Sequence, residues 1–274
     1  MSVVVSVCIP LYKETPFLKK TVLGVLNQSF KDWELILCIN ATSVVADAIR
    51  HDLADEIRDP RIRVVVDSTQ RNMAENWNAA VEASSGEFVK LLCHDDLLYS
   101  DCLERQVKAL QENPRAILAS GARTIINSAG KRLFKRCGIG KQGLYDGIDM
   151  IRRCIMAGAN IIGDPVCVMW RRSATEQLGY FDPSVVYCTD MEYWLRLLSI
   201  GDLYYDTEPV GFYRIHKNAA GTDLAGIAAA DIVHAARLQV KRGSIRLSAV
   251  ELKVVSTKAH LMGFIRQGIY RILG

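Results

Sequence analysis

Apolar runs and amphipathic stretches alternate over the first hundred residues of the chain. Residues 3–9 form a run rich in β-branched side chains, which is typical of a strand buried on both faces. Residues 16–28 repeat apolar positions at helical spacing, with Thr15 as a candidate cap. The same patterns predict strands at 33–39, 61–67 and 87–93 and helices at 44–57 and 73–83. This alternation predicts an α/β fold, a mostly parallel sheet with helices on both faces.

The pattern after residue 100 is less regular. It predicts helices at 103–113, 148–156, 173–178 and 191–200, strands at 116–120, 123–126 and 166–170, and a loop or hairpin at 127–147. From Asp223 onward we expect helix throughout, first Ala-rich and then basic. The chain is thus predicted to hold one domain over residues 1–222, with halves at about 1–100 and 101–222, and a basic amphipathic helical extension over 223–274.

Composition narrows the class of protein. The 274 residues carry 34 basic and 30 acidic side chains, a surplus too small and diffuse to indicate a nucleic-acid partner. Eight cysteines without a C-x-x-C pair, several of them in apolar runs, indicate buried free thiols rather than disulfides or zinc ligands. The N-terminus lacks a basic leader, and no apolar run is long enough to span a membrane. We expect a cytoplasmic protein.

Candidate chemistry gathers where the predicted strands end. Residues 10–12, Asn40 and the pair Asp95 and Asp96 follow three different strands, and ligands of such sheets bind outside the carboxyl ends of the strands. Two adjacent carboxylates repel each other unless a positive group offsets the repulsion, and a hard cation that bridges phosphates is one such group. The alternative interpretation is a helix cap at Asp96 or Ser100.

Two later stretches add further candidates. Asp190 precedes an amphipathic helix, where it could act as a general base or simply cap the helix. Arg214 and His216 alternate along a predicted strand and would therefore face the same side. A cation there could offset the charge of a leaving diphosphate, and a neutral imidazole could bind a metal; each could equally be structural.

Five blocks of the sequence resemble, in the same order, the family 2 glycosyltransferases, which are inverting enzymes of the GT-A fold. The blocks are VSVCIPLYKETPFLKKTVLGVLNQSFKDWELILCINA, NMAENWNAAVEASSGEFVKLLCHDDLL, VMWRRSATEQLGYFDPS, YCTDMEYWLRLL and EPVGFYRIH. They cover most of residues 3–216. The resemblance implies an inverting transferase of the bacterial surface-polysaccharide type, which moves a sugar from a nucleotide diphosphate sugar to a hydroxyl of a glycan or lipid-linked acceptor.

The resemblance also implies residues of the donor site. Pro10, Tyr12 and Glu14 would lie beside the nucleotide, and Asn78 would be structural or near it. Asn40 stands where the family has the second of two acidic residues, which pairs with uracil N3–H. Its carbonyl oxygen can still accept from an N–H, and its amide can also donate. A UDP-sugar is therefore the favoured donor. Thymidine and guanosine nucleotides are excluded less strongly than in family members that have the acidic residue at this position.

Metal and catalytic roles follow in the same way. Asp96 would bind Mn²⁺ or Mg²⁺ directly, Asp95 would lie near the ribose or a metal-bound water, and His216 and Arg214 would reach the metal or the diphosphate. Asp190 would be the catalytic base.

Other interpretations of the chain stay open. One is a non-catalytic module of the same fold that binds a nucleotide sugar or scaffolds a membrane assembly. The basic C-terminal stretch could place the protein on the inner face of the cell membrane as a peripheral protein. It could instead pack on the domain or on a second copy of the chain, as a homo-oligomer would require.

Overall fold

The computed structural model describes residues 3–217 and 227–273 of the chain. Within these residues, strands and helices alternate through the first half and then form longer and more irregular elements. The strands are β1 (Val5–Leu11), β2 (Trp33–Asn40), β3 (Ile62–Asp67), β4 (Phe88–Leu91), β5 (Leu97–Leu98), β6 (Ala116–Ile126), β7 (Arg132–Arg136), β8 (Gly143–Tyr145), β9 (Met169–Arg171) and β10 (Asp202–Arg214). The helices are α1 (Leu18–Leu26), α2 (Ser43–Asp52), α3 (Met73–Glu82), α4 (Cys102–Glu112), α5 (Gly147–Ala157), α6 (Arg172–Leu178), α7 (Thr189–Leu197), α9 (Ala228–Lys241) and α10 (Ala249–Leu273), with short 3₁₀ turns at Glu56–Arg58 and Pro165–Cys167.

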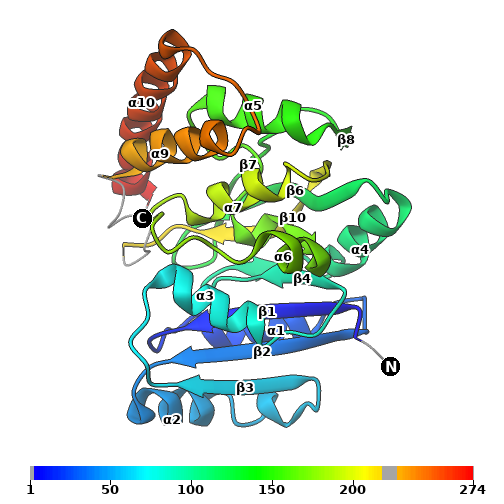
Figure 1. Ribbon diagram of the computed structural model, residues 1–274. Helices are drawn as coiled ribbons and strands as arrows, with labels where there is room; N and C mark the ends of the chain where they lie inside the picture. Colours follow the sequence, from blue (N-terminus) through cyan, green and yellow to red (C-terminus); the bar gives the residue numbers. More distant parts are fainter. Residues whose placement is uncertain (1–2, 218–226, 274) are drawn as a thin grey trace.

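The described strands form one mixed sheet with the order β3-β2-β1-β4-β9-β6-β10-β5, to which β7 and β8 are added at the side. β3, β2, β1 and β4 are mutually parallel, and the two longest strands, β6 and β10, are also parallel to each other. The remaining pairs are short and antiparallel. Helices cover both faces of the sheet (Figure 1). The predicted α/β class with a mostly parallel sheet is confirmed.

The first strand shows why the sheet assembles in this order. Every residue of β1 is buried, as its apolar run predicts. Its one hydroxyl, Ser6 Oγ, donates to Glu34 Oε1 on β2 at 2.6 Å, so this buried polar group is satisfied. Gly86, just before β4, lies so close to β1 that an added Cβ would be 2.6 Å from the backbone nitrogen of Ser6. A side chain at this position would separate β1 from β4.

Several predicted boundaries were wrong. β1 runs through Pro10 to Leu11, since an extended proline fits a strand wherever its missing N–H is not required. The strands expected at 116–120 and 123–126 are a single strand, β6, because Gly121 and Ala122 continue the pairing with β10. Residues 165–167 form a 3₁₀ turn instead of the start of a strand. The helix expected over 44–57 ends at Asp52, and that over 16–28 begins at Leu18, with Phe17 rather than Thr15 as its cap.

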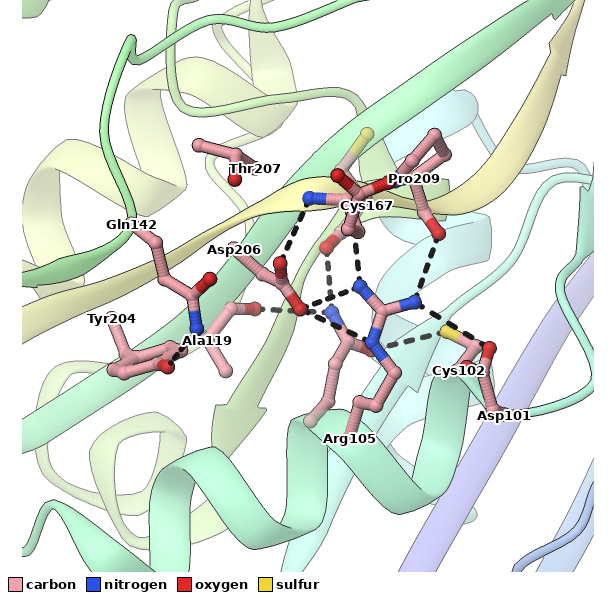
Figure 2. Close-up of polar contacts among 12 residues, drawn as sticks. Asp101, Cys102, Arg105, Ala119, Gln142, Cys167, Tyr204, Asp206, Thr207 and Pro209 are labelled. Carbon is pink, nitrogen blue, oxygen red and sulfur yellow. Dashed lines mark hydrogen bonds and ion pairs between the residues drawn. The ribbon is translucent and has the colours of Figure 1, made fainter.

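An arginine on α4 fixes an irregular part of β10 (Figure 2). The pairing of β10 with β6 shifts register between Asp206 and Gly211, which exposes backbone groups that the regular ladder would use. Arg105 donates to Asp206 Oδ2 at 2.5 and 3.1 Å and to the carbonyls of Glu208 and Pro209 at 3.2 and 3.1 Å. These bonds stabilise the irregular segment between Asp206 and Gly211, and thereby the path of β10 toward its end at Arg214.

The C-terminal region is helical, although not without interruption. The nine residues 218–226, which include the start of the predicted extension, lie outside the described residues. Beyond them, α9 and α10 are joined by a connection over 242–248, where the prediction had continuous helix. They pack on each other and on α5 and α7 (Figure 1). None of the helices in the described segments combines the length and the apolar character that crossing a bilayer requires.

Candidate active site

A cleft of about 610 Å³ opens at the carboxyl ends of the parallel strands. In Figure 1, the arrowheads of β1, β2 and β3 point toward the side on which the C-terminal end of α10 lies. Residues from distant parts of the chain line this cleft: Pro10 near the end of β1 and Tyr12 after it, Cys93 to Asp96 after β4, Asp190 at the start of α7, and Arg214 and His216 at the end of β10. The structure therefore brings together the acidic residues that the sequence places far apart.

The Asp95–Asp96 turn is held from two sides. Thr21 on α1 donates its hydroxyl to the carbonyl oxygens of Asp96 at 2.9 Å and of His94 at 3.1 Å. The backbone N–H of Arg214 donates to Asp96 Oδ1 at 2.9 Å, and His216 Nε2 donates to Asp95 Oδ2 at 2.8 Å. Helix α4 begins at Cys102, after Asp101, so neither Asp96 nor Ser100 is its cap. The capping alternative is thereby wrong for this pair.

The pKa values of the two neighbouring carboxyl groups are shifted in opposite directions. Burial raises the pKa of Asp96 well above its ordinary value, and the charge of Asp95 raises it further. Burial alone would also raise the pKa of Asp95, but the hydrogen bond from His216, the charges of His94 and His216 and a backbone hydrogen bond together outweigh burial and lower it. Without a bound cation, the pair therefore tends to carry one negative charge, with Asp95 ionised and Asp96 protonated. A cation beside the pair would favour the state in which both groups are ionised.

Cys93 completes a possible ligand set that the sequence analysis missed. One ligand atom from each of Cys93, Asp95 and Asp96 lies within 4.8 Å of the others. Two hard carboxylate oxygens suit Mg²⁺ or Mn²⁺, and the sulfur suits softer divalent ions, so this donor set fits a divalent cation. Burial, followed by the charges of Asp96 and Asp95, raises the pKa of this thiol well above its ordinary value. Its place in the run Cys93-His94-Asp95-Asp96, directly after β4, was the signal available in the sequence.

Arg214 stabilises the Asp95–Asp96 turn through hydrogen bonds. The strand ends at Arg214, so the predicted alternation of Arg214 and His216 along a strand does not apply. The Arg214 guanidinium is buried, stacks 4.4 Å above the ring of Phe17, and donates to three backbone carbonyls, those of Asp95 (2.7 Å), Asn127 (3.1 Å) and Ser128 (3.3 Å). Burial lowers its pKa, although Asp96 and Asp95 oppose this. Most of its hydrogen-bonding capacity is therefore used to hold the turn in place.

Asp190, which lines the same cleft, is held in one orientation. Its Oδ2 accepts from Asn160 Nδ2 at 2.9 Å, and its Oδ1 accepts from the backbone N–H of Met191 at 2.7 Å. Burial raises the pKa of Asp190 to about 7, and the charge of Asp164 adds to the effect. A carboxylate with a pKa near neutrality can accept and release a proton at physiological pH, as a general base must.

Asn160 and Asp164 were not predicted, since the segment that contains them has no readable motif. Asn160 Oδ1 accepts from the backbone N–H groups of Ile162 and Gly163, which fixes its amide toward Asp190. Asp164 pairs with the buried Arg123 at 2.8 Å. α7 begins after Cys188, without a side-chain cap. The residues that orient the candidate base thus come from the loop before the 3₁₀ turn at 165–167.

The residues predicted near the nucleotide divide into two groups. Tyr12 is half exposed and lies edge-on to His94, with ring centroids 5.7 Å apart, so it lines the cleft together with Pro10. Asn40, at the end of β2, is not among the residues that line the cleft, and its amide donates to the carbonyls of Asp67 (3.0 Å) and Thr69 (2.5 Å). With its amide hydrogens used in this way, Asn40 offers a ligand an acceptor oxygen.

Asn78 and Glu14 do not line the cleft. Asn78 donates to the carbonyl of Phe181 and accepts from its N–H, both at 2.9 Å, which fastens α3 to the loop after α6. Both polar atoms of its side chain thus have backbone partners, which fits the structural role that the sequence analysis left open for Asn78. Glu14 lies instead on a shallow groove next to α2.

The helices of the C-terminal extension also contribute to the cleft. Ile232 on α9 and Met262 and Ile265 on α10 line it along with Asp190. The extension thus adds apolar side chains to a cleft that also holds the acidic turn at Asp95 and Asp96.

Comparisons with known proteins agree with this geometry. Residues 6–179 match the family model described as glycosyl transferase family 2. Over 148 residues the chain is 28% identical to the UDP-Glc:alpha-D-GlcNAc-diphosphoundecaprenol beta-1,3-glucosyltransferase WfgD of Escherichia coli; the match covers 50% of this chain and only 57% of that enzyme. It is also 28% identical over 221 residues to the putative teichuronic acid biosynthesis glycosyltransferase TuaG of Bacillus subtilis, which covers 80% of this chain and 82% of the relative.

Two solved structures share the fold. The S. aureus TarS fragment 1–349 in complex with UDP-GlcNAc superposes with a TM-score of 0.69 at 13% identity, over 93% of this chain and 71% of that one. The Pyrobaculum calidifontis mannosyltransferase PcManGT, in complex with GDP-Man and Mn²⁺, gives 0.63 at 18% identity, over 98% and 73% of the two chains. The predicted GT-A architecture is confirmed by these superpositions.

Proposed function

Since the chain belongs to glycosyl transferase family 2, we propose that it transfers a sugar, with inversion, from a nucleotide diphosphate sugar to a hydroxyl of a glycan or lipid-linked acceptor in bacterial polysaccharide synthesis. One observation carries the proposal. Asp95, Asp96 and Asp190 line the same cleft. A leaving group and an attacking hydroxyl can therefore bind at once, with the anomeric carbon between them.

The donor diphosphate would bind at the Asp95–Asp96 turn. Asp96, Asp95 and Cys93 would hold a divalent cation, Mn²⁺ or Mg²⁺, which when bound offsets the charge of the departing diphosphate. His216 would contact the cation or the diphosphate, since it already hydrogen-bonds Asp95. Arg214 keeps the turn in place through Asp95 and Asp96, and its positive charge lies close enough to add to the local field.

Asp190 would act on the acceptor. Its carboxylate takes the proton from the acceptor hydroxyl as that oxygen forms a bond to the anomeric carbon, and the bond from this carbon to the diphosphate oxygen breaks with its electrons on the nucleoside diphosphate. Attack from the side opposite the leaving group inverts the anomeric configuration. Asn160 keeps one carboxylate oxygen engaged, so the carboxylate is oriented before the acceptor binds.

A UDP-sugar is the favoured donor. Asn40 offers an acceptor oxygen at the end of β2, which suits an N–H on the edge of a base. The E. coli relative and the TarS complex are described with UDP-sugars, and the archaeal mannosyltransferase with GDP-Man. A guanosine nucleotide also carries an N–H on its base edge, so the two donors need to be compared directly.

The test is release of nucleoside diphosphate from a panel of nucleotide sugars with Mn²⁺, with Mg²⁺ and with a chelator. We expect release from a UDP-sugar, loss of release with the chelator, and loss in Asp190→Asn while thermal-shift binding of UDP remains. Binding of a nucleotide sugar without turnover of any donor, across a panel of glycan and lipid-linked acceptors, would instead support the non-catalytic module. No binding of any nucleotide sugar would overturn the proposal.

A further inference from the structure

Helix α10 carries a stripe of exposed apolar side chains that the proposed reaction does not use. Five large apolar residues of this helix are exposed: Val250 (70%), Val254 (37%), Leu261 (59%), Phe264 (75%) and Ile265 (47%). At 3.6 residues per turn, their positions fall within about 100° of one another around the helix axis. Scattered exposed apolar residues are ordinary, but a continuous stripe of this kind marks a surface that meets an apolar partner.

The stripe faces away from the protein. Val255 and Ala259, on the opposite side of α10, are buried. Lys258 Nζ donates to the carbonyl of Met156 at 3.0 Å, and Arg152 on α5 pairs with Glu251. At Gly158, where α5 ends, an added Cβ would lie 2.7 Å from the backbone nitrogen of Ala259, so the two helices meet closely. These contacts fix the rotation of α10 and leave the stripe exposed, although Ile265 at its end also lines the cleft.

Positive charge borders the stripe on both sides. Lys253 and Lys258 fall just beyond its two edges on the same helical projection, and both are exposed. Arg246, just before the helix, is also exposed. Glu251, the acidic residue of this helix, is already paired with Arg152. An apolar stripe between lysines complements a surface that is apolar inside and anionic at its rim, which describes a bilayer with acidic headgroups.

The stripe also leads to the cleft. Ile265, at its C-terminal end, lines the cleft with Met262 and Asp190. An apolar path therefore runs along α10 from the outer surface to the wall that carries the candidate base. A protein lying on a bilayer along this face would turn its cleft toward the level of the headgroups.

We propose that the outward face of α10 docks on the surface of an anionic lipid bilayer. The docking does not depend on catalysis. Its use rests on the proposed function: it would bring the hydroxyl of a lipid-linked acceptor to Asp190 from the membrane side, while the donor enters at the Asp95–Asp96 turn.

The test is co-sedimentation of the full chain with vesicles of phosphatidylcholine alone or mixed with phosphatidylglycerol. We expect binding to the mixed vesicles that weakens as salt is raised, because exposed charges are screened. The double variant Leu261→Ser/Phe264→Ser should bind at least about tenfold less, since two side chains that would be buried in the bilayer become polar. Neither residue lines the cleft, so release of nucleoside diphosphate from a soluble donor should not change.

Val44→Ser is the matched control. Val44 is 77% exposed on α2, so its loss removes a similar apolar group from another face and should leave vesicle binding unchanged. Equal vesicle binding by the wild type and the double variant would overturn the proposal. So would absence of vesicle binding together with a dimer, seen by light scattering, that dissociates in the double variant, because the stripe would then join two copies of the chain. Either result leaves the glycosyltransferase proposal intact.

Discussion

Replacing Asp190 by Asn should remove catalysis and at the same time make the protein more stable at alkaline pH. As a general base, Asp190 is expected to contribute about 10²- to 10⁴-fold to the rate, so transfer should fall by that factor. The amide is nearly the same size as the carboxyl group, and therefore the cleft should keep its shape and its affinity for the donor. The two effects share one cause, the burial of a carboxylate.

The size of the stability effect follows from the pKa of about 7, against an ordinary Asp value of about 3.9. The folded protein holds this proton more tightly than the unfolded chain. Its free energy of unfolding therefore falls as the pH rises from about 4 to about 7, and stays low above that. The full penalty is about 4 kcal/mol at pH 8, of which less than half is already present at pH 5. Asn cannot carry the charge, so it escapes the penalty but loses one hydrogen bond, worth about 1 kcal/mol.

Chemical unfolding at pH 5 and pH 8, with a chelator present, measures the difference. The stability of Asp190→Asn relative to wild type should rise by about 2 to 3 kcal/mol between the two pH values. The exposed control Asp47→Asn should show no such rise, because its side chain is 73% exposed. An unchanged difference at both pH values would refute the electrostatic argument. Transfer near the wild-type rate would refute the assignment of the base.

Three further changes test other parts of the site. Asp96→Asn should reduce metal-dependent release of nucleoside diphosphate by at least about tenfold while leaving the fold intact by circular dichroism, because a ligand of the cation is lost; activity that no longer needs metal would contradict this. Cys93→Asp should raise activity with Mg²⁺ relative to Mn²⁺, since a hard oxygen replaces a soft sulfur, and an unchanged ratio would show that the thiol does not touch the metal. Asn78→Ala should lower the free energy of unfolding by about 1 to 3 kcal/mol, because it leaves the Phe181 backbone unpaired, with the KM for the donor unchanged; a raised KM would instead place Asn78 at the nucleotide site.

The sequence was enough to place Asp95, Asp96 and Asp190 in one cleft, because parallel strands bring their carboxyl ends to a common edge and the family motifs named the acids. It was not enough for Cys93 or Asn160. A cysteine at the end of an apolar run looks the same in the sequence whether its side chain packs in the core or lines a cleft. For Cys93, the turn after β4 determines which of the two applies. Asn160 orients the base from a loop whose course depends on tertiary contacts.

The role of Asn78 stayed open for a different reason. A polar residue on a helix beside the metal-binding strand looks the same in the sequence whether it meets a ligand or a backbone segment about a hundred residues later. Arg214 shows the intermediate case. The motif predicts that it reaches the metal or the diphosphate, whereas its hydrogen bonds to backbone carbonyls could be seen only in the structure.

The bond from the Arg214 backbone to Asp96 has a consequence for how the protein matures. The ribosome completes the turn that carries Asp96 long before it makes β10, which ends at Arg214. A nascent or truncated chain that stops short of β10 could form the first four parallel strands, yet its acidic turn would lack both the bond from the Arg214 backbone and His216. Under the proposed function, we expect such a chain to hold a donor diphosphate more weakly than the finished molecule does.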